Sequence, residues 1–164
     1  MDYCIKSATY LRDVNDKLKI PSKKINLRKS IENYINKKKL PDNVEVTVDI
    51  DDNVFFNGDK VGCDIVLSNL IRNSSESTRE RCLIQLYMED IDADNLILYF
   101  EDNGSGIKKN SIKYLFDLFT PARRKGHQGL GLITTKAIIT NWGGDISLFK
   151  TGNDGTIFKI NLKK

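Results

Sequence analysis

The chain has 164 residues, of which 40% are hydrophobic and 29% are charged, and its formal net charge of +4 is mild. This length suits one domain that buries a hydrophobic core without disulfides, and so small a charge gives no electrostatic argument for nucleic-acid binding. Three cysteines fit no metal spacing and no apolar run approaches the ~18 residues of a membrane span, so we expect a soluble cytoplasmic protein with reduced thiols and no membrane contact.

The first predicted element is a helix over residues 1–19. Its apolar residues, from Cys4 to Leu18, recur at roughly heptad spacing, and a stripe that narrow needs a partner helix. Pro21 stops this helix because proline cannot continue it. We therefore divide the chain into a helical remnant or linker over 1–20 and a main domain over 21–164.

The rest of the chain alternates between helical and strand patterns. Alternation from Val44 to Ile50 predicts a half-buried strand, which the acidic turn at 51–53 joins to a short strand at 54–56 as a hairpin. The predicted helices are 27–39, 60–80, 109–119 and 130–142, and the further strands are 82–88, 95–101, 145–150 and 156–162. Helices and strands alternate without strict βαβ rhythm, which predicts an α/β fold, a two-layer sandwich with a mixed sheet.

Two asparagines stand out in the helix predicted at 60–80. Asn69 and Asn73 are four residues apart, so both amides emerge on one helix face, next to the apolar stripe. An amide oxygen is a hard neutral donor of the kind that Mg²⁺ accepts. Taken alone, two asparagines on a helix are usually surface residues, so this pair gains meaning only from the segments that follow.

Asp102 follows an apolar strand and precedes two glycines, Gly104 and Gly106. Glycines let backbone approach closely, and a carboxylate at a strand end can accept a hydrogen bond from an exocyclic amine such as that of adenine. The same residues also make an ordinary Asp-Asn-Gly turn, and the segment alone leaves both interpretations open.

A glycine-rich segment from Gly126 to Leu132 runs into the predicted helix at 130–142. Backbone N–H groups at such a junction, together with the helix dipole, favour phosphate binding. The cations of Arg123-Arg124-Lys125 lie just upstream and can reach terminal phosphates. The segment is neither a dinucleotide-binding fingerprint nor a P-loop. Its His127 is the sole histidine of the chain, and we expect a loop residue there rather than a catalyst.

Taken in order, these segments resemble the ATP-binding catalytic domain of sensor histidine kinases, part of the GHKL superfamily. The resemblance covers about residues 25–164, and its strength lies in the register of all its motifs rather than in any one. The matching motifs are the N box at 64–74, the G1 box at 102–107, the F box at 115–119, the core of the G2 box at 129–132 and the G3 element at 155–158.

The resemblance implies a Bergerat-type α/β sandwich, with a mostly antiparallel sheet packed against three helices, that holds Mg-ATP between the N-box helix and a lid. It implies that Asn73 ligates Mg²⁺, that Asp102 binds the adenine amine and that Thr156 supports the adenine end. It places Asn69 near the phosphates as a catalytic residue, with the lid cations Arg124 and Lys125 touching the γ-phosphate. The other nucleotide-binding residues it implies are Gly104, Gly106, Ile107, Gln128, Gly129, Leu130, Gly131 and Leu132.

The resemblance also implies partners. Such kinases phosphorylate a histidine on a preceding helical-hairpin dimerisation domain, and a response regulator receiver domain acts downstream. This chain has no histidine before residue 127, and residues 1–19 resemble the last turns of that hairpin. We therefore expect an excised catalytic module, or a natural one that acts in trans. One departure is that Glu76 and Ser77 stand where the family often carries Lys or Tyr.

Two alternatives share the same motifs. One is a protein-serine kinase and binding module of the anti-sigma type, which needs no hairpin. The other is an ATP-binding switch without transferase activity. The sequence favours the histidine kinase module because residues 1–19 read better as a hairpin remnant.

Overall fold

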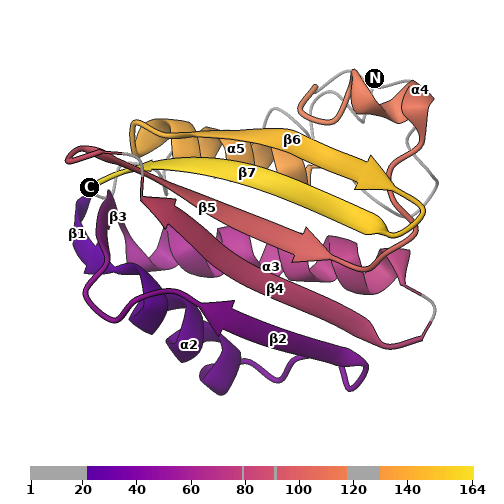
Figure 1. Cartoon of the computed structure of the whole chain (residues 1–164), viewed down its shortest axis with the longest axis horizontal. Helices are drawn as coiled ribbons and strands as arrows, with labels where there is room; N and C mark the ends of the chain where they lie inside the picture. Colours follow the sequence, from indigo (N-terminus) through magenta and orange to yellow (C-terminus); the bar gives the residue numbers. More distant parts are fainter. Residues whose placement is uncertain (1–21, 79, 91, 118–129) are drawn as a thin grey trace, which may run out of the picture.

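The computed structural model describes residues 22–78, 80–90, 92–117 and 130–164, and statements about structure concern these ranges. A five-stranded sheet runs through the molecule in the order β2-β4-β5-β7-β6, and a separate two-stranded ribbon joins β1 to β3 (Figure 1). The elements are β1 (Lys23–Asn26), α2 (Leu27–Lys37), β2 (Val44–Asp49), β3 (Phe55–Gly58), α3 (Lys60–Ser77), β4 (Cys82–Asp90), β5 (Asn95–Asp102), α4 (Lys109–Ile112), α5 (Gly131–Asn141), β6 (Asp145–Gly152) and β7 (Gly155–Lys163).

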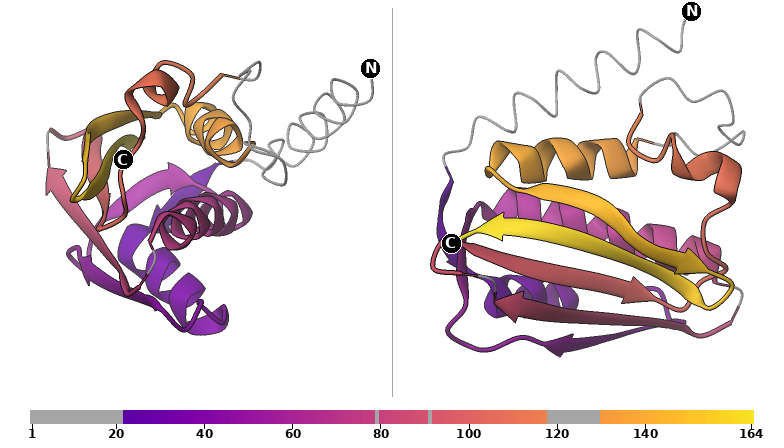
Figure 2. Two further views of the ribbon diagram at one scale, coloured as in Figure 1. Left: turned by 90° about the vertical axis from the view of Figure 1, so that its right-hand side faces the viewer. Right: turned by 45° about the horizontal axis from the view of Figure 1, so that its top comes forward.

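The sheet is mixed but mostly antiparallel. Strand β2 pairs parallel to β4, whereas the β4–β5, β5–β7 and β6–β7 pairs are antiparallel. The helices α2, α3 and α5 lie on one side of this sheet, as the edge-on view in Figure 2 shows. The predicted two-layer α/β sandwich with three packed helices is therefore confirmed.

The core lies between the sheet and these helices. Strand β7 alternates buried and partly exposed residues, so that Phe158, Ile160 and Leu162 face the helices. Helix α3 contributes four buried residues to the same core, Val66, Leu67, Leu70 and Ile71. Each such side chain contributes about 1.5–3 kcal/mol on burial, which is why the sequence alternation decides which face of the sheet the helices cover.

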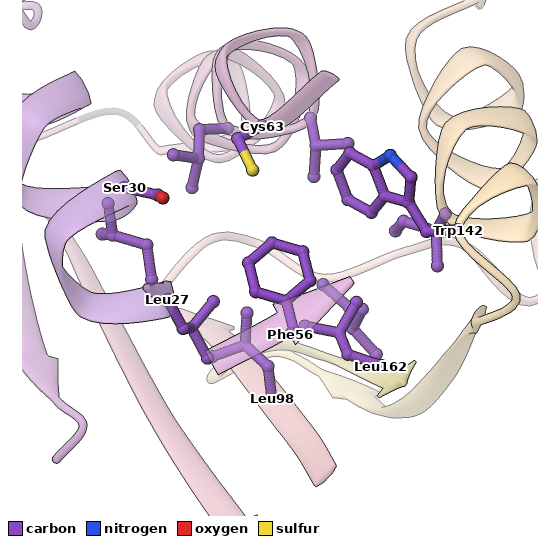
Figure 3. Close-up of a pocket in the computed structure, with 12 residues that line it drawn as sticks. Leu27, Ser30, Phe56, Cys63, Leu98, Trp142 and Leu162 are labelled. Carbon is purple, nitrogen blue, oxygen red and sulfur yellow. The ribbon is translucent and has the colours of Figure 1, made fainter. Parts of the chain in front are cut away.

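A small cavity of about 30 Å³ remains in this core, close to Phe56, Cys63 and Trp142 (Figure 3). Its lining is apolar, and the nearby Ser30 hydroxyl already donates to the Asn26 carbonyl at 2.7 Å. Burial raises the pKa of the Cys63 thiol, with the nearby Asp59 and Asp64 carboxylates adding to the rise, so this cysteine stays neutral. A gap that is about as large as one water molecule and offers no polar partner is a packing defect, not a ligand site.

The hairpin predicted from residues 44–50 and 54–56 is wrong. Strand β3 pairs antiparallel with β1, with Ile25 opposite Phe56, and β2 pairs with β4 instead. The first residue of α2 lies beside the residue that follows the acidic turn, because Leu27 N–H donates to the Val54 carbonyl at 2.9 Å. This contact aligns β3 with the residues just before the helix. Strand β1 itself, a four-residue stretch beginning with two lysines, was not predicted.

The other element bounds differ little from the predicted ones. Helices α2 and α3 end at Lys37 and Ser77, a few residues early, and the helix expected over 109–119 is only Lys109–Ile112 followed by turns. Within the described ranges no helix is long and apolar enough to cross a membrane. The helix expected at 1–19 and the proposed boundary near residue 20 lie outside the described residues.

Candidate functional site

Helix α3 carries both predicted asparagines. The helix starts cleanly because the Asp59 side chain caps it, accepting a hydrogen bond from Gly62 N–H at 2.7 Å. From this fixed start, Asn69 and Asn73 fall one turn apart on one side of the helix, and Asn69 contacts the start of α5. The two side chains nevertheless have different surroundings.

Asn69 is buried, with 7% of its surface exposed, and connects α3 to α5. Its amide nitrogen donates to the Gly131 carbonyl at 3.0 Å and approaches the Thr135 hydroxyl at 3.4 Å. A Cβ placed on Gly131 would lie 3.3 Å from the Asn69 Oδ1 atom, so a glycine suits this approach. Asn69 therefore fixes the start of α5, where the glycine-rich segment meets the helix.

Asn73 is only half-buried, and its side chain forms no hydrogen bond with any residue in the described ranges. Its amide oxygen is thus available to a ligand. An oxygen donor of this kind suits a hard cation such as Mg²⁺, which binds few protein groups and keeps waters and phosphate oxygens in its shell. The donor chemistry fits the metal role that the sequence predicts for this residue.

Asp102 ends strand β5 and is buried, with 7% of its surface exposed. Its Oδ1 atom accepts from Gly104 N–H at 2.8 Å, and its Oδ2 atom accepts from the Ser74 hydroxyl at 2.8 Å. Thr156 on β7 stands directly opposite Asp102 in the sheet register and is also buried. The carboxylate, the threonine hydroxyl and the residue after Asn73 are thereby brought together from three elements.

Two glycines are required where the loop after β5 and the β6–β7 hairpin approach each other closely beside Asp102. Gly155 has φ +131°, and a Cβ there would lie 1.8 Å from the Asp102 carbonyl oxygen. Gly106 has φ +71°, and a Cβ there would lie 2.0 Å from the Gly152 carbonyl oxygen. Only glycine adopts such conformations at low cost and also leaves room for the neighbouring backbone. These glycines allow the loop after β5 to pack against the β6–β7 hairpin.

Hydrogen bonds with neighbouring strands hold that loop in place. Asn103 accepts from Leu83 N–H at 2.8 Å and donates to the Arg81 carbonyl at 3.0 Å, which ties the loop to the start of β4. On the other side, Ile107 N–H donates to the Thr151 hydroxyl at 2.8 Å, and Thr151 lies 3.2 Å from the Thr156 hydroxyl. The loop after Asp102 is therefore fixed on both flanks.

Ser74, Asn103 and Thr151 are polar residues at this site that sequence reasoning missed. Asn103 belongs to the Asp-Asn-Gly segment and Ser74 directly follows Asn73, so both lie within motifs that the sequence analysis identified. Their roles depend on contacts with other elements, and no local pattern signals those contacts.

A second buried cysteine lies near the Asp102 carboxylate. Cys82 is fully buried at the start of β4. Burial raises the pKa of its thiol, the Asp102 charge raises it further, and a hydrogen bond with Thr78 opposes the rise. At neutral pH the group therefore stays a protonated thiol and offers no nucleophile.

At the other end of the site, only part of the glycine-rich segment lies in the described ranges. Leu130 is buried and precedes α5, and its carbonyl accepts from Thr134 N–H at 2.9 Å. Gly131 and Leu132 form the first residues of that helix. The predicted residues Arg124, Lys125, His127, Gln128 and Gly129 lie outside the described residues. The structure thus brings together Asp102, Gly104, Gly106, Ile107 and Thr156 at one end, and Asn69 with Gly131 at the other. Asn73 lies on α3 one turn after Asn69.

Comparisons with known proteins show which family the chain is similar to. The sensor protein SrrB of Staphylococcus aureus is 38% identical over 106 residues, covering 62% of this chain and 18% of its own length. The sensor histidine kinase GacS of Pseudomonas protegens is 32% identical over 113 residues, covering 64% of this chain and 12% of its own length. The chain thus spans less than a fifth of these relatives.

Solved structures share the fold. The Acinetobacter baumannii histidine kinase AdeS superposes with a TM-score of 0.73 at 22% identity, covering 97% of this chain and 76% of the other. The catalytic domain of histidine kinase ThkA also gives 0.73, at 23% identity, with coverages of 88% and 97%. Residues 58–164, more than half of the chain, match the family described as histidine kinase-, DNA gyrase B-, and HSP90-like ATPase.

Proposed function

The chain belongs to the family of histidine kinase-, DNA gyrase B- and HSP90-like ATPases, and we propose that it binds Mg-ATP and donates the γ-phosphate to a histidine of a dimerisation domain. In this proposal it is the catalytic module of a two-component sensor kinase. One observation carries it: the buried Asp102 carboxylate is hydrogen-bonded to the residue that directly follows Asn73. The proposed base acceptor is therefore linked to the residue next to the proposed metal ligand.

Asp102 would recognise the base. A carboxylate only accepts hydrogen bonds, so it pairs with the exocyclic amine of adenine and disfavours a base with an oxygen at that place. The Thr156 hydroxyl beside it supplies a further polar group. Gly104, Gly106 and Ile107 belong to the loop after β5, which would lie beside the base.

The residues proposed to hold the metal and the phosphates come from α3, from the start of α5 and from the glycine-rich segment before it. Asn73 would ligate Mg²⁺ through its amide oxygen, and the bound ion supplies charge neutralisation for the phosphates. Asn69 fixes the start of α5, so the backbone N–H groups of its first turn, beginning at Gly131 and Leu132, can bind phosphate oxygens. In the proposal, Leu130 and Gly129 shape the lid, Gln128 contacts the nucleotide, and Arg124 and Lys125 stabilise the γ-phosphate.

The phosphoacceptor would come from another domain. In the transfer, the bond from the γ-phosphorus to the bridging oxygen breaks, a phosphorus–nitrogen bond to an imidazole forms, the imidazole releases its proton and ADP leaves. The sole histidine of this chain, His127, lies in the proposed lid. The partner is therefore a His-containing dimerisation domain, in cis in a longer protein or in trans, and a response regulator receiver domain takes the phosphate next.

The test uses labelled ATP in two steps. Binding of ATP to the chain is measured with Mg²⁺ and with EDTA, and we expect tighter binding with Mg²⁺. The chain is then incubated with candidate His-containing dimerisation domains, and we expect acid-labile label on the one it serves. Absence of Mg²⁺-dependent ATP binding would overturn the proposal. Binding without transfer to any histidine domain would favour the non-catalytic switch, and label on a serine of a partner would favour the anti-sigma type.

A further inference from the structure

The structure assigns a positioning role to Ser74: we propose that its hydroxyl fixes the Asp102 carboxylate and thereby sets the preference for an amino-bearing base. This inference rests on the proposed function, since it concerns how the same site selects its nucleotide. Ser74 is 2% exposed and sits on α3, and Asp102 ends β5. The contact between them joins two residues that are 28 positions apart in the chain.

The Ser74 hydroxyl has two acceptors within reach but only one proton to donate. Its oxygen lies 2.8 Å from Asp102 Oδ2 and 3.1 Å from the Leu70 carbonyl one helical turn back. Serines inside helices commonly bond the carbonyl one turn back, and that contact has no functional meaning by itself. A hydrogen bond to a carboxylate is shorter and about twice as strong as one to a neutral carbonyl, so the proton belongs to Asp102.

With Ser74 in place, each oxygen of the carboxylate accepts one hydrogen bond from the protein. Gly104 N–H occupies Oδ1, and the Ser74 hydroxyl occupies Oδ2. Two donors at two oxygens fix the rotation of the group, which is otherwise a broad and soft torsion. Each oxygen keeps a further acceptor site, and the two hydrogen bonds fix the directions in which these remaining sites point.

A fixed carboxylate discriminates better than a free one. It meets the exocyclic amine of adenine with a ready acceptor, and it meets the exocyclic oxygen of a purine such as hypoxanthine with a repulsive, unpaired contact. Without the Ser74 hydroxyl, Oδ2 loses its protein donor in the described part of the chain, and the group can rotate away or recruit water. Binding of the adenine nucleotide then weakens, and the penalty against the oxygen-bearing base falls.

The test compares ATP with inosine triphosphate, which carries an oxygen where ATP carries the amine. Dissociation constants for both are measured with Mg²⁺ by competition against a fluorescent nucleotide, on the intact chain. Ser74→Ala should lower the ratio of the dissociation constant of inosine triphosphate to that of ATP by roughly 3- to 10-fold, a change of the size of one ordinary net hydrogen bond. Ser74→Cys keeps the volume with a weak donor and should lower the ratio as well, whereas Ser74→Thr retains the hydroxyl and should restore it.

The matched control is Ser68→Ala, the same change at an exposed position of α3, which should leave the ratio unchanged. A packing role for Ser74 would weaken both nucleotides equally, so an unchanged ratio in both the Ala and the Cys variants overturns the inference. That outcome leaves the proposed function standing, provided that the unmodified chain binds ATP in preference to inosine triphosphate. An unmodified chain that binds no ATP overturns the proposed function and this inference together.

Discussion

The two ends of the candidate site are built differently. Around Asp102, hydrogen bonds from α3, β4 and β6 fix the carboxylate and its loop, and the groups that would read the base are buried. Around Asn73, the amide is half-exposed and makes no hydrogen bond within the described ranges. The proposed base end is therefore preorganised by the fold, whereas the proposed metal end offers a donor whose remaining partners would come with the ligand. Substitutions at the first end should affect folding and selectivity, and those at the second should affect binding alone.

The largest effect is expected where the backbones cross. Gly155→Ala places a methyl group 1.8 Å from the Asp102 carbonyl at a φ that disfavours side chains. We expect a loss of about 3 kcal/mol or more in the free energy of unfolding, together with loss of ATP binding. Denaturant unfolding and nucleotide titration measure both quantities.

The β6–β7 turn offers a matched control for this change. Gly152 pairs with Gly155 across the hairpin, but a Cβ there would meet nothing within 4 Å. Gly152→Ala should therefore stay within about 0.5 kcal/mol of the unmodified chain. Equal effects of the two substitutions would contradict the view that the base end depends on close backbone packing.

Asn73→Ala tests the other end. We expect roughly 100-fold weaker ATP binding in the presence of Mg²⁺ and little change in EDTA, because the amide would serve the metal. The free energy of unfolding should change by less than about 0.5 kcal/mol, since the side chain is half-exposed and unbonded in the described ranges. Isothermal titration with and without EDTA separates the two conditions. Unchanged affinity with Mg²⁺ would exclude Asn73 as a ligand, and Asn36→Ala on α2 serves as the exposed control.

Asp102→Asn tests the chemistry of base recognition rather than its support. The amide keeps the size of the carboxylate and can still accept from Gly104 N–H, but it presents N–H groups where Oδ2 accepts in the native chain. We expect roughly tenfold weaker ATP binding and a shift of preference towards inosine triphosphate. Retention of the native ratio of the two dissociation constants would place base recognition elsewhere.

The sequence predicted the helices α2, α3 and α5 and the main strands. The alternation from Val44 to Ile50 correctly indicated a strand, yet its pairing was wrong because partner choice is decided by distant contacts. Here the side chain of Arg28 in α2 donates to the Ile50 carbonyl at 2.9 Å, which turns the chain after β2 towards β1. The sequence of the acidic turn at 51–53 does not indicate whether the turn joins two paired strands or leads the chain out of the sheet.

The same distinction applies to the site. Asp102, Gly106 and Asn73 belong to motifs with fixed spacing, so their place could be predicted. Ser74 and Thr151 act through one hydroxyl each, across elements that meet only in the folded chain. A single serine or threonine in a helix or an edge strand carries no sign of such a contact.

Thr151→Val measures how much the second flank of the base end contributes. Valine keeps the branched shape but removes the hydroxyl that accepts from Ile107 N–H and lies 3.2 Å from the Thr156 hydroxyl. We expect about threefold weaker ATP binding and a loss of ~1 kcal/mol in the free energy of unfolding, the net value of one hydrogen bond. The opposite edge of the sheet supplies the control: Thr47 on β2 reaches the Ile84 carbonyl only at 3.4 Å, so Thr47→Val should leave ATP affinity unchanged. If both valine variants bind ATP as the native chain does, the loop after β5 is held by β4 alone, and preorganisation of the base end comes from one flank rather than two.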